Sequence, residues 1–213
     1  RKGNFNIFSN NNNNYLNRIL LSCLSSYIYR KLMPSNEQLL NQARNLDENA
    51  LTEIYDTYNL ELYKYAYRIL GDQMQAEDCV SETFNRFLNA LHKGKGPKDN
   101  IRAYLYRIAH NWITDQFKSK SNKTIQIDIE QFSSKEKLPE IQVHDNLSLE
   151  RVRLAMKNLT PDQRQVIALK FFEGWNSKEI SNIMEKPIGA IKSLQYRAIS
   201  AMKKLISQQI KEV

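Results

Sequence analysis

The feature that most constrains the fold is an apolar stripe that recurs at three- and four-residue spacing between positions 51 and 69. Its members are Leu51, Ile54, Tyr55, Tyr58, Leu62, Tyr65, Ala66 and Ile69. Residues at this spacing share one face of an α-helix, so the stripe predicts an amphipathic helix whose apolar face needs partners. The chain has only six glycines and five prolines, and strand-like alternation is confined to short stretches. We therefore predict an all-α fold.

The same periodicity predicts further helices on both sides of this one. An apolar stripe at Leu39, Leu40 and Ala43 starts a helix near position 35, and Gly71 followed by Asp72 ends the long helix. A third helix is expected over 73–91, with inward-facing Val80, Phe84, Phe87, Leu88 and Leu91. A loop rich in lysine and glycine follows at 93–98. A fourth helix is expected over 99–117, with Asp99 or Asn100 as its N-cap.

Helical periodicity fails from position 119 to 145, which is long for a loop inside one compact domain. We therefore predict two small helical domains, at 35–118 and 147–213, joined by a flexible acidic linker at 119–146. In the second domain, Thr160 and Pro161 predict a helix start with Thr160 as the N-cap.

Residues 1–34 differ from the rest in composition and carry an asparagine tract without acidic residues. Two interpretations stay open. Basic, serine-containing leaders of this kind are typical of targeting peptides. The interpretation that we favour is that translation begins at Met33 and that the preceding residues are not native.

Charge is distributed in blocks along the chain, whose net charge is +8. Residues 37–92 are acidic, 93–123 basic, 124–150 acidic and 151–213 basic. A basic balance indicates a polyanionic partner without choosing between DNA, RNA and an acidic membrane. The alternation indicates at least two surfaces for two different partners.

Several classes of protein lack support in the sequence. Cys23 and Cys79 lie far apart, and His92, His110 and His144 have no metal-ligand spacing with them. We therefore expect no metal and no cofactor, and a reducing, cytoplasmic setting. The apolar run at 16–29 is too short and too polar to span a membrane. Because phosphate-binding and nucleophile motifs are also absent, we expect that the protein is not an enzyme.

Residues 177–206 predict a helix-turn-helix. Ser177 is expected to cap a short helix over 178–184, and the turn at 185–187 leads to a longer helix from Ile188. The longer helix has an apolar stripe on one face, made of Ile191, Leu194, Ala198, Met202 and Leu205. Its other face carries Lys192, Ser193, Tyr196 and Arg197. This pattern favours insertion into the DNA major groove, and the alternative is a helical hairpin with a solvated basic face.

Here the sequence resembles a known family. Residues 159–180 (LTPDQRQVIALKFFEGWNSKEI) are similar to the start of region four of sigma factors, and residues 188–198 (IGAIKSLQYRA) are similar to its recognition helix. The resemblance implies recognition of the promoter element near minus thirty-five. The implied contacts are Lys192, Ser193, Tyr196 and Arg197 to bases and phosphates, and Ser177 and Lys178 to phosphates. The family usually has alanine at Ser181 and glycine at Glu185, so we expect a slightly strained turn.

The first half resembles the same family independently. Residues 75–88 (QAEDCVSETFNRFL) are similar to the region-two helix that docks on the clamp helices of the largest polymerase subunit. The resemblance implies that the polymerase contact comprises Glu77, Asp78, Glu82, Phe84 and Phe87, with the acids as the outer face and the phenylalanines as the packing side. Taken alone, the acids are better explained as a solvated helix N-terminus.

Residues 101–115 (IRAYLYRIAHNWITD) resemble the helix that contacts the melted minus-ten element. The implied contacts to single-stranded DNA are Lys98, Asn100, Tyr104, Arg107 and Asn111, and the loop at 95–100 would hold a flipped base. Aromatic side chains between cations suit this role, because a base can stack while phosphates are neutralised. The alternative is that the aromatic residues fill a small core; we expect this of Trp112 and leave both interpretations open for Tyr104.

Two motifs in this order imply a minimal sigma factor of the extracytoplasmic-function (ECF) type in the sigma-70 family. Such a protein would direct bacterial RNA polymerase to promoters and assist their opening. The implied partners are core RNA polymerase, promoter DNA in duplex and single-stranded form, and an anti-sigma factor. We expect a monomer without membrane contact. The main alternative is a stand-alone helix-turn-helix regulator, which would bind paired half-sites without polymerase; a helical interaction or RNA-binding protein is a third.

Overall fold

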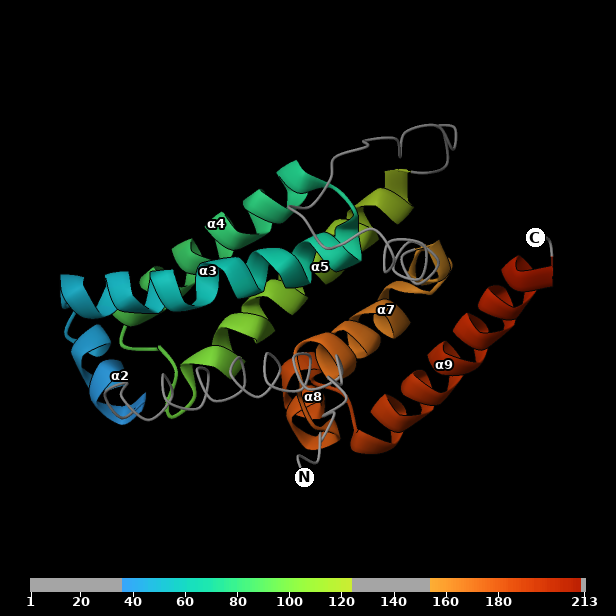
Figure 1. Cartoon of the computed structure of the whole chain (residues 1–213). Helices are drawn as coiled ribbons and strands as arrows, with labels where there is room; N and C mark the ends of the chain where they lie inside the picture. Colours follow the sequence, from blue (N-terminus) through green and yellow to red (C-terminus); the bar gives the residue numbers. More distant parts are fainter. Residues whose placement is uncertain (1–35, 124–153, 212–213) are drawn as a thin grey trace, which may run out of the picture.

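The computed structural model describes residues 36–123 and 154–211, which form helices without a strand (Figure 1). The all-α prediction is confirmed. The N-terminal bundle comprises α2 (Asn36–Arg44), α3 (Glu48–Leu70), α4 (Gln73–His92) and α5 (Ile101–Lys123). The C-terminal bundle comprises α7 (Pro161–Ile167), the π-helical turn η1 (Ala168–Phe172), α8 (Ser177–Met184) and α9 (Ile188–Lys211). The predicted leader and most of the predicted linker lie outside the described residues.

The ends of α3 and α4 follow from single residues. Asp47 caps α3 by accepting a hydrogen bond from the Ala50 amide at 2.9 Å. Gly71 ends α3 in the left-handed conformation at φ 72°, which glycine adopts without a steric cost. Asp72 then caps α4 by accepting from the Gln75 amide at 2.8 Å. The predicted break at positions 71 and 72 is confirmed.

Helix α5 starts at one of the two predicted N-caps and ends later than predicted. The Asn100 side chain accepts from the Ala103 amide at 2.9 Å, so Asn100, rather than Asp99, caps the helix. The helix continues to Lys123 instead of ending at Phe117. No glycine or proline occurs in the polar residues 118–123, and lysine favours helix, so the last turns form without an apolar stripe.

The core of the N-terminal bundle contains most of the predicted stripe. Ile54, Leu62, Tyr65, Ala66 and Ile69 of α3 are buried, and α3 and α5 pack against α4. Two predicted inward residues are exceptions: Tyr55 is 47% exposed and Leu88 is 37% exposed. Each lies at the edge of its helix's apolar stripe, beside the fully buried Ile54 and the 1% exposed Phe87.

The starts of α7 and α8 in the C-terminal bundle are set by two capping boxes, which satisfy otherwise unpaired amides. Thr160 and Gln163 form the first, and Pro161 begins α7, as predicted. In the second, Asn176 rather than Ser177 caps α8, accepting from the Lys178 and Glu179 amides at 2.9 and 3.0 Å. Glu179 accepts from the Asn176 amide in return, at 2.7 Å, which makes Asn176 the better cap.

The turn between α8 and α9 is strained, as the sequence predicted. Glu185 lies in the left-handed region at φ 52° and ψ 39°, where a side chain crowds its own backbone. The Ser181 hydroxyl donates a 2.5 Å hydrogen bond to the Lys186 carbonyl oxygen and so stabilises the same turn. Both departures from the family pattern therefore meet at one turn.

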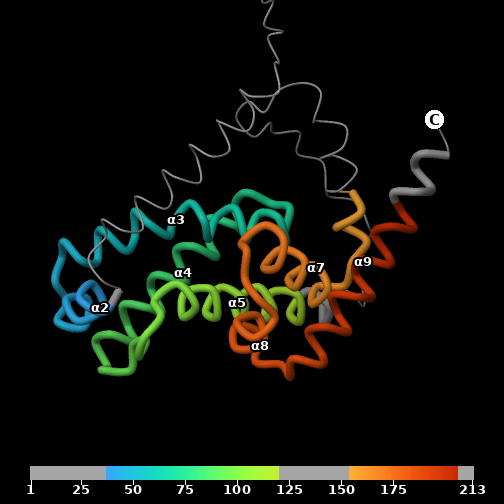
Figure 2. The backbone as a smooth tube through the Cα atoms, turned by 60° about the horizontal axis from the view of Figure 1, so that its bottom comes forward, coloured from blue at the N-terminus to red at the C-terminus, as the bar shows by residue number. Residues whose placement is uncertain are grey.

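The two bundles pack directly against each other. α3 and α5 contact α7, and α8 packs on α5 (Figures 1 and 2). The Trp175 ring lies edge-on to the Tyr106 ring, with 5.4 Å between centroids, and one core cluster contains residues of both bundles. We call this packing the closed arrangement.

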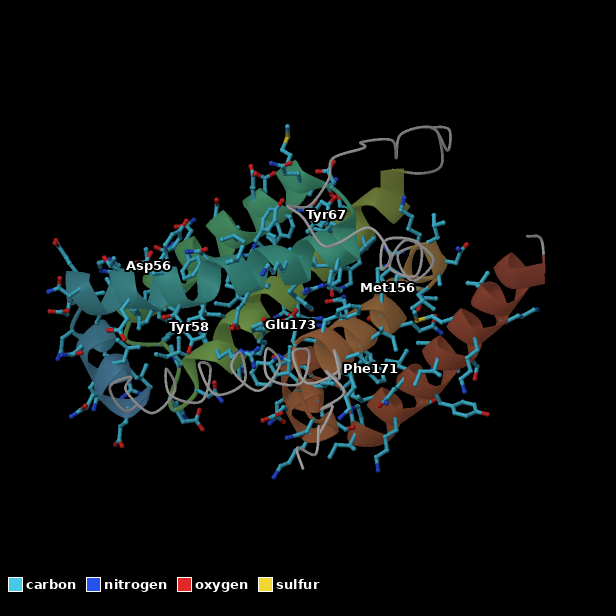
Figure 3. The ribbon with its side chains drawn as sticks, viewed as in Figure 1. Asp56, Tyr58, Tyr67, Met156, Phe171 and Glu173 are labelled. Atoms are coloured by element: carbon cyan, nitrogen blue, oxygen red, sulfur yellow. The ribbon has the colours of Figure 1, made fainter. Side chains whose placement is uncertain are left out.

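Polar groups inside this interface are paired across it. The Glu173 carboxylate, 6% exposed, lies where the bundles meet (Figure 3). Arg68 of α3 donates to Glu173 Oε1 and Tyr106 of α5 donates to Oε2, each at 2.6 Å. Arg102 of α5 adds an ion pair at 3.9 Å. The carboxylate is thus compensated by side chains of α3 and α5 in the N-terminal bundle.

A second buried group is the Gln165 side chain. Its Oε1 accepts from the Tyr65 hydroxyl at 3.0 Å and contacts His110 Nδ1 at 2.6 Å, while its Nε2 donates to Thr114 Oγ1 at 3.3 Å. Because burial lowers the pKa of His110, its neutral form is favoured, and Nδ1 carries the proton that the Gln165 oxygen accepts. These bonds also join the two bundles.

The strained turn gives a first prediction. Glu185→Gly should raise the free energy of unfolding by about 1 kcal/mol, because glycine removes the left-handed strain but loses more entropy on folding. Urea denaturation measures this difference. Glu185→Ala is the control, since it removes the carboxylate and keeps the Cβ. An equal gain from the alanine variant would contradict the backbone explanation.

The interface gives a second prediction. Glu173→Gln keeps the shape of the side chain but leaves the Arg68 and Arg102 charges without their buried partner. It should destabilise the closed arrangement by about 2 kcal/mol, which is less than the loss of a fully buried ion pair because both arginines are partly exposed. Small-angle X-ray scattering should then show a larger radius of gyration. The control is Glu61→Gln, which removes the more exposed partner of Arg102 (45%, 3.0 Å). Equal effects of the two variants would refute this role of Glu173.

Candidate DNA and polymerase contact surfaces

The outer face of α9 presents the predicted upstream contacts. Lys192, Ser193, Tyr196 and Arg197 are all exposed, and Tyr196 reaches 75%. On the opposite face Ile191 and Ala198 are fully buried, so the orientation of the helix is fixed by its apolar stripe. The surface formed by these four exposed residues, which we call the α9 surface, combines two cations with donors and acceptors of the kind that contact base edges.

Helix α8 packs against α9, and its first two residues were also predicted to contact DNA. Lys178 is exposed and Ser177 is half-buried. The amides of Lys178 and Glu179 are already bonded to the Asn176 side chain. A phosphate at this helix start would therefore meet the Ser177 hydroxyl and the Lys178 ammonium group rather than those two amides.

Helix α4 carries an acidic face, which we call the α4 surface: Glu77, Asp78 and Glu82. Glu77 and Asp78 are exposed. Glu82 accepts a 2.7 Å hydrogen bond from Arg86, which lowers the pKa of its carboxyl group. Asp78 and Glu82 also line a shallow hollow beside Trp112. An acidic surface of this kind suits a basic protein partner.

Phe84 and Phe87 do not belong to this surface. Their exposed fractions are 8% and 1%, because Phe84 packs on the Tyr55 ring at 4.8 Å and Phe87 on the Tyr104 ring at 6.3 Å. Both are core residues, so in this structure neither side chain is accessible to a partner. The sequence placed them on the packing side of the helix, and the structure shows that this side is filled from within the bundle.

Most of the residues predicted to contact melted DNA lie in the first turns of α5 or in the loop before it. Tyr104 is half-buried, and its hydroxyl lies 3.5 Å from the Lys95 carbonyl oxygen. The Arg107 guanidinium lies 5.2 Å from the centroid of the Tyr104 ring. Asn111 is exposed one turn further along the helix. Tyr104 therefore takes part in packing, through Phe87, and also faces the loop that precedes α5.

Lys98 and Asn100 lie in that loop and are both exposed. The side chain of Asn100 caps α5, so one of its two polar atoms has a structural role. Trp112, 9% exposed, is a core residue, as the sequence predicted.

Sequence reasoning missed Arg44 at the end of α2. Its guanidinium donates to the carbonyl oxygens of Pro97 and Lys98 in the loop before α5, at 2.9 and 2.8 Å. In the sequence Arg44 is one basic residue in the last turn of a helix. No local pattern indicates a bond to residues 53 and 54 positions away.

The described parts of the chain offer little chemistry of other kinds. Within 36–123 and 154–211 there is no group of three or more His, Cys, Asp or Glu side chains that could hold a metal ion. None of the helices in these two stretches has the length and apolar character that crossing a membrane requires. Burial raises the pKa of the Cys79 thiol to about 12, which disfavours a reactive thiolate.

Comparison with known proteins identifies the two bundles. The family model for sigma-70 region 2 matches residues 54–123, and the model for sigma-70 region 4 matches residues 155–204. The ECF RNA polymerase sigma factor BldN of Streptomyces coelicolor is 32% identical over 171 residues, which are 79% of this chain and 65% of that protein. SigX of Bacillus subtilis, another ECF sigma factor, is 25% identical over 74% of this chain and 84% of its own length.

Solved structures show the same fold. The sigma factor RpoE of Bartonella quintana, solved with the anti-sigma factor NepR, matches with a TM-score of 0.61 and 21% identity over 73% of this chain and 96% of that one. CnrH, solved with the cytosolic domain of CnrY, matches with a TM-score of 0.61 and 20% identity over 82% of this chain and 99% of that one. Sigma factors are transcription initiation factors and not enzymes. With both regions matched in order, the chain belongs to the sigma-70 family and is an ECF-type RNA polymerase sigma factor.

Proposed function

We propose that this protein brings core RNA polymerase to specific promoters and assists their opening. The observation that carries the proposal is the presence of two chemically opposite exposed surfaces on the two family regions. The α9 surface is cationic and belongs to region 4, whereas the α4 surface is anionic and belongs to region 2. A DNA-binding protein that also docks on another protein needs this separation, because one surface cannot suit both partners.

The proposed division of labour assigns each partner to one surface. The α9 surface, with Ser177 and Lys178, contacts the duplex near minus thirty-five, where lysine and arginine reach guanine acceptors and phosphates. The α4 surface docks on the clamp of the largest polymerase subunit. Lys98, Asn100, Tyr104, Arg107 and Asn111 contact the opened minus-ten strand by stacking and charge.

This function requires the closed arrangement to open. The two promoter elements are separated by roughly 25 base pairs, or about 85 Å of B-DNA at about 3.4 Å per step. A compact body of about 150 residues has a radius of gyration of about 15 Å, too small to contact both elements at once. The 30 residues at 124–153 could bridge up to about 100 Å if extended, so the covalent connection permits separation.

The proposed function also implies where the protein acts and which regulatory partner it has. Bacterial polymerase and promoter DNA are cytoplasmic, so the protein acts there. Two proteins of the same fold were solved with protein partners, RpoE with the anti-sigma factor NepR and CnrH with the cytosolic domain of CnrY. We include an anti-sigma factor among the proposed partners. The stand-alone regulator is not favoured, because it gives no role to the α4 surface or to the region-2 match.

The test is a double dissociation between the two surfaces. Lys192→Ala combined with Arg197→Ala should weaken holoenzyme binding to duplex promoter DNA at least tenfold, since each lost contact is worth about 1–3 kcal/mol, while core affinity is unchanged. Asp78→Lys should lower core affinity by about tenfold through charge reversal. Fluorescence anisotropy with labelled core or labelled DNA measures both affinities.

Each arm has a matched control. Lys203→Ala with Lys204→Ala removes the same charge from the exposed far end of α9, and Asp56→Lys reverses an exposed acid on α3. Both controls should leave the affinities within about twofold, as surface substitutions usually do. Loss of core binding in the α9 variant, or unchanged core affinity in Asp78→Lys, would contradict the assignment of the surfaces.

A further inference from the structure

The loop between α4 and α5, residues 93–100, is held in shape by a residue of α2. Arg44 Nη2 donates to the Pro97 carbonyl oxygen at 2.9 Å and to the Lys98 carbonyl oxygen at 2.8 Å. The other terminal nitrogen, Nη1, donates to Asn41 Oδ1 at 3.1 Å, one turn earlier in α2. The guanidinium is thus oriented from its own helix and joins two consecutive carbonyl groups of the loop.

A second set of contacts, with the end of α4, fixes the same loop. A Cβ atom at Gly96 would lie 2.6 Å from Leu91 Cδ2, so any larger residue there would displace the end of the Leu91 side chain. Leu91 is 4% exposed and Pro97 is buried. The loop backbone therefore packs against the end of α4 on one side and is hydrogen-bonded to Arg44 on the other.

These contacts shape a hollow with a cationic rim. It has a volume of about 540 Å³ and is lined by Arg44, Leu91, Gly94, Lys95, Gly96 and Lys98. Leu91 supplies an apolar floor, whereas Arg44, Lys95 and Lys98 supply positive charge. Tyr104 adjoins the loop through its hydroxyl, 3.5 Å from the Lys95 carbonyl oxygen. An apolar floor and a cationic rim suit a flat base with its phosphate.

We propose that Arg44 is a positioning residue for capture of the flipped promoter base, an inference that rests on the proposed function. Arg44 fixes the loop before DNA arrives, so base binding does not have to supply the free energy of ordering the loop. A specificity pocket also has to be held to within about 0.5 Å to discriminate between bases. Arginine is required because its planar fork serves two carbonyls and Asn41 together, which a lysine ammonium group cannot do with the same geometry.

The test compares Arg44→Lys and Arg44→Gln with the unaltered protein, each assembled with core polymerase. The probe is forked DNA with a duplex upstream part and a short random single-stranded tail, from which bound molecules are sequenced. Arg44→Lys keeps the charge and loses the fork, so it should reduce preference at one tail position by roughly tenfold. Upstream sequence preference, core affinity and unfolding temperature should stay near those of the unaltered protein.

The charge control is Lys64→Gln, which removes one exposed cation from α3 and should leave base preference unchanged. Equal base preference for Arg44→Lys and the unaltered protein would overturn the role of Arg44 while leaving the proposed function standing. A loss spread evenly over the tail, with lower core affinity, would also overturn it, because that pattern reports general destabilisation. If the unaltered holoenzyme shows no base preference in the single-stranded tail, both the capture site and the positioning role of Arg44 are refuted.

Discussion

The closed arrangement depends on one buried carboxylate. Glu173 sits in the C-terminal bundle, and its charge is compensated by Arg68, Arg102 and Tyr106 of the N-terminal bundle. A buried charge without these partners would be costly, so the position of region 4 on region 2 is tied to this group. In water, however, the same carboxylate and guanidinium groups are well hydrated. When the interface opens, the free energy lost with these polar contacts is partly offset by hydration of the charged groups. An apolar core has no such compensation.

The apolar part of the interface opposes opening. Trp175 lies against Tyr106 and under the Arg102 guanidinium, 4.4 Å from its ring centroid, and opening would expose these surfaces to water. Opening therefore has to be coupled to binding that is worth more than this burial. In the closed arrangement the α4 surface and the α9 surface are both already exposed. Docking on polymerase can accordingly precede opening and supply the free energy for it.

Much of the fold could be predicted from sequence because its determinants are local. The apolar period placed α3, α4 and α9, Gly71 and Thr160 placed helix ends, and the face opposite Ile191 and Ala198 is the exposed one. Where two neighbouring residues could cap, as with Asn176 and Ser177, the outcome depended on the reciprocal bond from Glu179, which propensity alone does not rank.

What sequence reasoning missed depends on contacts between distant residues. Arg68 and Glu173 are 105 positions apart, and Arg44 meets the loop across 53, so no local pattern links either pair. Phe84 and Phe87 show the reverse case: the family motif joined them to the acidic surface, but their partners, Tyr55 and Tyr104, come from other helices and bury them. The resemblance to the family identified the motif in the sequence, but which of its residues are accessible depends on how the helices pack.

The proposed function is that this chain gives core polymerase its promoter specificity. The most direct measurement is in vitro transcription from fragmented genomic DNA of the source bacterium, with its core polymerase and with or without this protein, followed by mapping of transcript starts. We expect new starts that share an upstream sequence and a melted-region sequence and that appear only when core and protein are both present. Folded protein that binds duplex DNA by itself and yields no new starts would contradict the proposed function and favour a stand-alone regulator.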